Sequence, residues 1–135
     1  MIRALLDTNI LISAIFWKGS PRKVSDAAAS LKFEALTSTF ILQEVERVLL
    51  RGPFSVPPIR IQQILRDILS YTTLVYEKKV GKKIKSRDPN DQKILEAAIG
   101  SGAQFLVTGD RDLLVLNTIQ NLKIISPTDF LTILY

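Results

Sequence analysis

The sequence contains no cysteine and no histidine. Without cysteine, the chain has no disulfide, no thiolate nucleophile and no cysteine-ligated zinc site. Without histidine, it has no imidazole base, which also excludes Ser-His-Asp and Cys-His catalytic systems. Any chemistry must therefore use carboxylates, lysine, tyrosine or hydroxyl groups.

Long apolar runs are absent as well. Charged or polar residues interrupt every run before the roughly 18 residues that a membrane span requires. The apolar start of the chain meets an acid at Asp7, too early for a secretory signal. We therefore expect a cytoplasmic protein without a membrane partner. The 135 residues suit a single domain over residues 1–135, and the hydrophobic content of 47% is sufficient for its core.

Short apolar strands alternate with longer amphipathic helices along the chain. This alternation predicts an α/β fold, a three-layer α/β/α sandwich with a central parallel sheet. Ser20 followed by Pro21 is typical of a helix N-cap and first helical position. The expected strands are residues 2–6, 33–37, 72–76, 104–108 and 123–125, and the expected helices are residues 10–17, 20–31, 39–51, 59–69 and 88–101, a short helix from Asp112 and a last helix after Ser126.

Two aspartates follow predicted strands. Asp7 comes directly after the first strand, and Asp110 comes two residues after the fourth. Ligands of parallel α/β sheets bind in the crevice beyond the carboxyl ends of the strands, so acids at these positions are candidates for a functional site. The alternative is structural, because aspartate also caps helices and favours turns. Asp112 is expected to cap the short helix that follows it.

Acids within the predicted helices are harder to interpret. Asp91 shares a helix face with apolar residues three, four and seven positions later, which turns it partly inward, but it also suits a helix opening next to Asp88. Glu44 and Glu46 both lie on edges of the helix at 39–51. Periodicity does not choose between these two glutamates, and a solvated position is open for either.

Two aromatic residues, Phe16 and Trp17, follow Ile15 and form with it the most aromatic short run of the chain. Core packing is the expected role of this run. Stacking on a nucleic-acid base and contact with a partner protein are the alternatives.

Several segments together resemble the PIN nucleases. They are LLDTNIL at residues 5–11, Glu44, RDPND at residues 87–91 and VTGDRDL at residues 107–113, in the order found in that family. The resemblance covers nearly the whole chain and ends with ISPTDFL at residues 125–131. Within the family, the chain is similar to the VapC-type toxins of toxin-antitoxin systems.

The resemblance implies a function and a site. It implies an endoribonuclease that depends on Mg²⁺ or Mn²⁺, acts as a toxin, pairs with an antitoxin and forms a homodimer. Clustered carboxylates repel one another, by roughly 3 kcal/mol for a pair 5 Å apart at an effective dielectric near 20, and a hard divalent cation relieves that repulsion. Carried over to this sequence, the catalytic and metal-binding acids are Asp7, Glu44, Asp91 and Asp110, with Asn9, Thr108 and Asp112 as supporting polar residues.

The net charge of +5 and the pI near 9.6 favour a polyanionic partner. Residues 78–87 hold the densest group of cations and are expected to form a flexible basic loop. Such a loop can bind the RNA backbone, although lysine-rich loops are often only solvated. The candidate backbone contacts are Lys82, Lys83, Lys85 and Arg87.

Two other functions are compatible with an acid-lined parallel sheet. One is a phosphatase or receiver-like domain with Asp7 as the phosphorylated nucleophile. Haloacid-dehalogenase-like enzymes place a second aspartate two residues after the first, where this chain has Asn9, so the motif disfavours this function. The other is a catalytically silent PIN-fold module that binds RNA or protein, and the sequence leaves it open.

Overall fold

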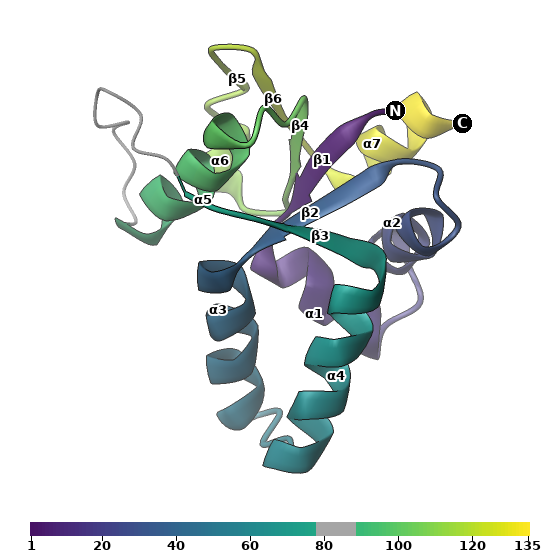
Figure 1. Cartoon of the computed structure of the whole chain (residues 1–135), viewed down its shortest axis with the longest axis vertical. Coiled ribbons are helices and arrows are strands. Elements are labelled where there is room, and N and C mark those ends of the chain that lie inside the picture. The colour runs from purple at the N-terminus through teal and green to yellow at the C-terminus, as the bar shows by residue number, and fades with distance from the viewer. Residues whose placement is uncertain (78–88) are drawn as a thin grey trace.

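A computed structural model describes residues 1–77 and 89–135 of the chain. The predicted basic loop at 78–87 therefore lies outside the described residues, as do Lys82, Lys83, Lys85 and Arg87 as candidate RNA contacts and Asp88 as a candidate cap. The described elements alternate between strands and helices in the predicted order, and both termini lie close together beside α7 (Pro127–Leu134) (Figure 1).

The strands form one six-stranded sheet in the order β3-β2-β1-β4-β6-β5. Every neighbouring pair is parallel except β5 and β6, which pair antiparallel. The prediction of a parallel sheet is thus correct for its five longer strands and wrong at one edge. The strands are β1 (Arg3–Leu6), β2 (Glu34–Ser38), β3 (Thr72–Val75), β4 (Phe105–Val107), β5 (Thr118–Ile119) and β6 (Leu122–Ile125).

The antiparallel edge has a local explanation. β5 contains only two residues, too few to show strand periodicity, and it turns into β6 through Gln120 and Asn121. Gln120 has a φ of 52°, a conformation that hairpins usually place on glycine. Because the turn contains no glycine or proline, the sequence lacks the usual hairpin signal.

The helices cover the sheet and complete the predicted three-layer α/β/α architecture. α1 contacts both α2 and α3, and α2 contacts α7. α3 and α4 contact each other and project away from the sheet as an antiparallel pair (Figure 1). The helices are α1 (Thr8–Phe16), α2 (Ser20–Ala29), α3 (Thr39–Leu50), α4 (Pro58–Tyr71), α5 (Pro89–Gly100), α6 (Arg111–Leu114) and α7 (Pro127–Leu134). In the described parts of the chain, no helix combines the length and apolarity that a membrane crossing needs.

The start of α2 differs from the prediction by one residue. Gly19 is the N-cap, and Ser20 is already helical. The hydroxyl of Ser20 instead lies 3.0 Å from the hydroxyl of Thr128, which links α2 to the first turn of α7. The cap of α7 follows the prediction, because the Ser126 side chain accepts a hydrogen bond from the amide of Asp129.

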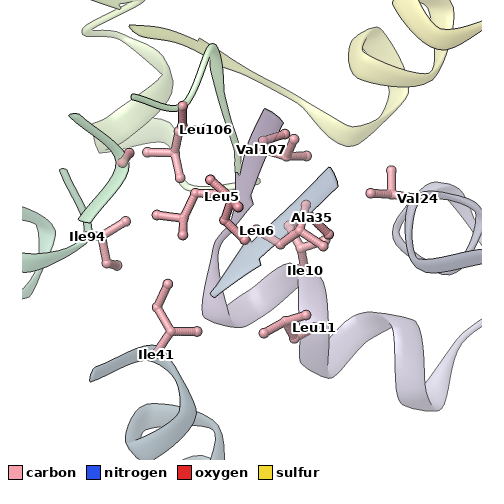
Figure 2. Close-up of a cluster of buried hydrophobic side chains, with 14 of the residues drawn as sticks. Leu5, Leu6, Ile10, Leu11, Val24, Ala35, Ile41, Ile94, Leu106 and Val107 are labelled. Carbon is pink, nitrogen blue, oxygen red and sulfur yellow. The ribbon is translucent and has the colours of Figure 1, made fainter. Parts of the chain in front are cut away.

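The core lies around the two central strands. The side chains of β1 and β4 are almost all fully buried, which accounts for the continuous apolar runs in these segments. Buried helix residues such as Ile10, Ile41 and Ile94 surround these two strands from different directions (Figure 2). The rigid ends of β1 and β4 therefore fix the positions of the residues that directly follow them.

Candidate active site

Asp7 lies at the carboxyl end of β1, and it is only 4% exposed. Both of its carboxylate oxygens accept a hydrogen bond: Oδ1 accepts from the Thr8 amide at 2.7 Å, and Oδ2 accepts from the Thr108 hydroxyl at 2.7 Å. Asp7 is also the N-cap of α1, so the structural and functional interpretations of this residue are compatible. The carboxylate is held between the first and fourth strands.

Asp110 is connected to Asp7 through Thr108. The amide of Asp110 donates to the Thr108 hydroxyl at 3.0 Å, and that hydroxyl in turn donates to Asp7. The Asp110 side chain caps α6 by accepting from the amide of Asp112 at 2.9 Å. The expectation that Asp112 caps this helix is therefore wrong, because Asp112 lies in its first turn and supplies the donor.

Glu44 approaches Asp7 from α3. Its Oε1 accepts a hydrogen bond from the Thr8 hydroxyl at 3.2 Å, and its Oε2 forms an ion pair with Arg47 at 2.7 Å. Glu46 faces another neighbour, because its carboxylate lies 3.5 Å from the amide of Gln62 on α4. Helical periodicity did not distinguish the two glutamates, but the structure does, and it is Glu44 that lies near Asp7.

Asp91 is 3% exposed in the first turn of α5. Ile94, Leu95 and Ala98 on the same face are also buried, so the predicted inward orientation of Asp91 is correct. α5 contacts β1, which Asp7 directly follows, and α3, which carries Glu44. Asn9, one of the predicted supporting residues, is exposed on α1.

Burial dominates the electrostatics of Asp7. The pKa of this carboxyl group is raised from 3.8 to about 6, chiefly by desolvation and to a smaller extent by the negative charges of Asp110 and Glu44. The hydrogen bonds from Thr108 and Thr8 oppose this effect by stabilising the carboxylate. Ionisation of Asp7 is therefore unfavourable in the protein alone, and a cation bound beside it would favour the ionised form.

The donor set suits a particular kind of metal site. Within residues 1–77 and 89–135, no three acidic side chains converge into a ready-made metal cage. The four predicted acids therefore do not form a closed metal-binding cluster. Mg²⁺ and Mn²⁺ often bind through one or two carboxylates and keep several waters, which a partly open group of hard oxygen donors can accommodate. Asp7 and Asp110 fit that coordination, with Glu44 within electrostatic reach.

Two contributing residues were not identified from the sequence. One is Thr8, which contacts both Asp7 and Glu44. Arg47 pairs with Glu44, and the i, i+3 spacing on a helix is the signal that could have predicted this pair. Thr8 gave no comparable signal, because its contact with Glu44 joins positions 36 residues apart.

A small hollow of about 300 Å³ lies between α3 and α5. Its walls include Gln43 and Lys93, neighbours in sequence of Glu44 and Asp91. The Lys93 ammonium lies 5.1 Å from the centre of the Phe40 ring, a cation–π distance that holds a positive charge between these two helices.

Comparisons with known proteins agree with this architecture. A family profile described as a PIN domain matches residues 3–112. VapBC2 from Rickettsia felis, in a structure bound to a DNA fragment from its promoter, is 20% identical with a TM-score of 0.67, and the match covers 93% of this chain and 98% of that one. DNA-bound VapBC from Salmonella typhimurium is 18% identical with a TM-score of 0.65, covering 94% and 99%.

A third similar structure is that of the PIN domain endonuclease Utp24, at 15% identity and a TM-score of 0.54, covering 92% of this chain and 84% of that one. No curated protein sequence matches the chain. At these identities, the structural likeness concerns the fold, and the family profile covers most of the chain. The predicted family resemblance and the predicted three-layer fold are both confirmed.

Proposed function

The chain belongs to the PIN-domain family, and from this premise we propose that it is a metal-dependent endoribonuclease, the toxin of a toxin-antitoxin pair. The observation that supports this most strongly is the grouping of Asp7, Glu44 and Asp110 beyond the carboxyl ends of β1 and β4. Asp7 is buried, and its desolvation and its repulsion by Asp110 and Glu44 disfavour the charged form, so a bound cation would stabilise this group of acids.

Asp7 and Asp110 would hold the divalent ion, with Glu44 and Asp91 beside them. Such an ion activates water for attack on a phosphodiester and neutralises charge on the phosphate. The chain's own residues orient the ligands. Thr108 fixes one oxygen of Asp7 and the backbone of Asp110 with a single hydroxyl group. The Asp112 amide then sets the rotamer of the Asp110 carboxylate.

Cations beside the acids can bind the RNA backbone. Arg47 is half exposed next to Glu44, and Lys93 is exposed on α5 two residues after Asp91. Each phosphate contacted by such a residue contributes to an affinity that falls as salt rises. These described residues supplement the proposed contacts of Lys82, Lys83, Lys85 and Arg87.

The proposal extends to partners. The similar structures from Rickettsia felis and Salmonella typhimurium are VapBC complexes, which supports an antitoxin partner for this chain. A homodimer and a cytoplasmic location belong to the same proposal. Co-expression with the product of the neighbouring gene, followed by affinity purification and light scattering, tests both partners. Recovery of a monomer without a bound protein would reject this part of the proposal.

The direct test of the activity uses labelled RNAs with Mg²⁺, with Mn²⁺ and with EDTA. Wild type should cleave RNA only when metal is present, and Asp7→Asn should lose at least about 100-fold in rate. Asp129→Asn is the matched control, since Asp129 is an exposed acid on α7, and it should cleave normally. Folded wild type that cleaves no RNA with either metal would instead favour the catalytically silent binding module.

A further inference from the structure

Three aromatic rings form a surface cluster at the far end of α1 from Asp7. Trp17 is 57% exposed and Phe16 is 40% exposed, so the expectation of core packing is wrong for these two residues, whereas Ile15 packs against the core. Phe16 stacks on Phe54 with ring centres 4.8 Å apart and an angle of 22°. The edge of the Trp17 ring lies against both, at 5.8 Å from Phe16 and 6.4 Å from Phe54. We call Phe16, Trp17 and Phe54 the aromatic platform.

The platform is fixed in place by neighbouring groups. The Arg22 guanidinium donates hydrogen bonds to the carbonyl oxygens of Ala14 and Ile15, which holds the last turn of α1. The amide of Trp17 donates to the Ser13 carbonyl at 3.0 Å. Phe54 packs partly against the hydrophobic core. A preorganised surface of this kind binds planar ligands at a small entropic cost.

The segments that supply the platform are rich in positive charge. Residues 8–25 and 47–66 contain seven cations and no acid, and the acids that adjoin these segments are Asp7, Asp26, Glu46 and Asp67. A polyanion complements such a surface, whereas a second copy of the same face would be repelled. The seven cations are Lys18, Arg22, Lys23, Arg47, Arg51, Arg60 and Arg66.

Two helices connect the platform to the acidic site. Phe16 is eight residues beyond Thr8 on α1, a distance of about 12 Å at the helical rise of 1.5 Å per residue. On α3, Arg47 follows Glu44 at i+3, and Arg51 caps the same helix at i+7, before the loop that carries Phe54. α1 and α3 also contact each other. Arg47 and Arg51 therefore place positive charge between the acids and the aromatic rings.

We propose that the aromatic platform is a stacking site for the bases of a single-stranded RNA whose phosphate backbone occupies the acidic site. Aromatic rings beside cations recognise single strands by stacking without selecting a sequence, because every base has a π face. The identity of the ligand as RNA rests on the proposed function. The stacking geometry rests on Phe16, Trp17 and Phe54 themselves.

Trp17 is the single tryptophan of the chain, so its fluorescence reports on the platform directly. A 20-nucleotide single-stranded RNA is titrated into the full chain in EDTA, and into Asp7→Asn, with the RNA checked for integrity on a gel. RNA should quench the Trp17 emission with saturation. Heparin, a polyanion without bases, should bind but leave the emission unchanged.

Variants then measure the contribution to affinity by anisotropy of labelled RNA. Trp17→Ala should raise the Kd about 10-fold, and Trp17→Phe should restore most of the affinity. Tyr135→Ala is the matched control, because Tyr135 is an aromatic residue with 77% exposure on another helix end. It should leave the Kd unchanged.

Different outcomes separate this inference from the proposed function. Equal quenching by heparin and RNA, or equal Kd values for wild type and Trp17→Ala, would overturn the platform while leaving the ribonuclease proposal intact. A Trp17 emission that shifts with protein concentration and does not respond to RNA would assign the platform to a second copy of the chain, which also overturns it. Saturable quenching by RNA in a protein that cleaves nothing would support the platform and reject the nuclease.

Discussion

The two ends of α1 reverse the usual pattern of burial for charged and aromatic side chains. At its N-terminus, the charged Asp7 is buried at 4% exposure, and at its C-terminus, the aromatic Trp17 is 57% exposed. Charged groups are normally solvated and large aromatic groups normally covered, so both ends cost stability. One helix therefore places two unfavourable features about 15 Å apart. Residues that lower the stability of a fold indicate a functional role. Variants at the two ends of α1 measure how much stability the burial of Asp7 and the exposure of Trp17 each cost.

Asp7→Asn should produce the largest change in stability, and it should be a gain. The pKa of Asp7 is about 6 in the folded chain, against an ordinary value of 3.8. An acid with a raised folded pKa favours folding only while it is protonated, so wild type loses stability relative to Asp7→Asn as the pH rises from about 4 to 6. Above pH 7 in EDTA, the variant should be more stable by up to about 3 kcal/mol.

Urea denaturation of both proteins at pH 4 and pH 8 measures this difference. The gain in the free energy of unfolding should be present at pH 8 and nearly absent at pH 4. A variant that is less stable than wild type at pH 8 would show that the Asp7 carboxylate stabilises the fold, contrary to the comparison of the two helix ends.

Thr108→Val should have the next largest effect. The valine keeps the shape of the side chain but removes the hydroxyl that donates to Asp7 and accepts from Asp110. The free energy of unfolding should fall by about 1–2 kcal/mol, and RNA cleavage should slow about 10- to 100-fold.

Thr37→Val supplies a matched control on β2, which is separated from β4 by β1. The Thr37 hydroxyl is also buried but has no hydrogen-bond partner among the described residues, so its removal should be neutral or stabilising. Equal losses of stability in the two variants would mean that buried threonines, and not the link between the acids, account for the effect.

Arg47→Gln should change RNA binding more than stability. The Arg47–Glu44 ion pair is half exposed on its arginine side, so its loss should alter the free energy of unfolding by less than about 0.5 kcal/mol. If Arg47 contacts a phosphate, the slope of log Kd against log salt should become shallower by about 0.7. An exposed cation on the opposite side of the fold, Lys32, gives the control Lys32→Gln, whose salt slope should match wild type.

Trp17→Ala should have the smallest effect on stability. An exposed ring that contacts two neighbours at the surface contributes little to folding, so the free energy of unfolding should stay within about 0.5 kcal/mol of wild type when circular dichroism follows urea denaturation. A loss of more than 2 kcal/mol would place Trp17 in the structural core and remove the contrast between the two ends of α1.

Much of the fold could be predicted because its central strands are buried on both faces. Continuous apolar runs such as Ala4 to Leu6 mark such strands, and the cap at Ser126 marks where the last helix begins. The two-residue β5 could not be predicted, because it is too short for a period and its turn at Gln120 lacks glycine.

The site was only partly predictable for a different reason. Asp7 and Asp110 could be proposed because each follows a strand, and parallel strands bring their carboxyl ends together. The link between Thr8 and Glu44 spans 36 positions, and no local pattern encodes it. The exposure of Trp17 was equally hidden, because an aromatic residue in an apolar helix has the same local sequence whether the fold covers it or not.

The most direct test of the central claim, that Asp7 and the acids around it hold a divalent cation, is the melting temperature at pH 8 with and without Mg²⁺. Wild type should gain several degrees on addition of Mg²⁺, because binding to the folded state stabilises it by mass action. Asp7→Asn should melt higher than wild type in EDTA and should not respond to the metal. Equal responses of the two proteins, or no response from wild type at millimolar Mg²⁺ and Mn²⁺, would contradict the account.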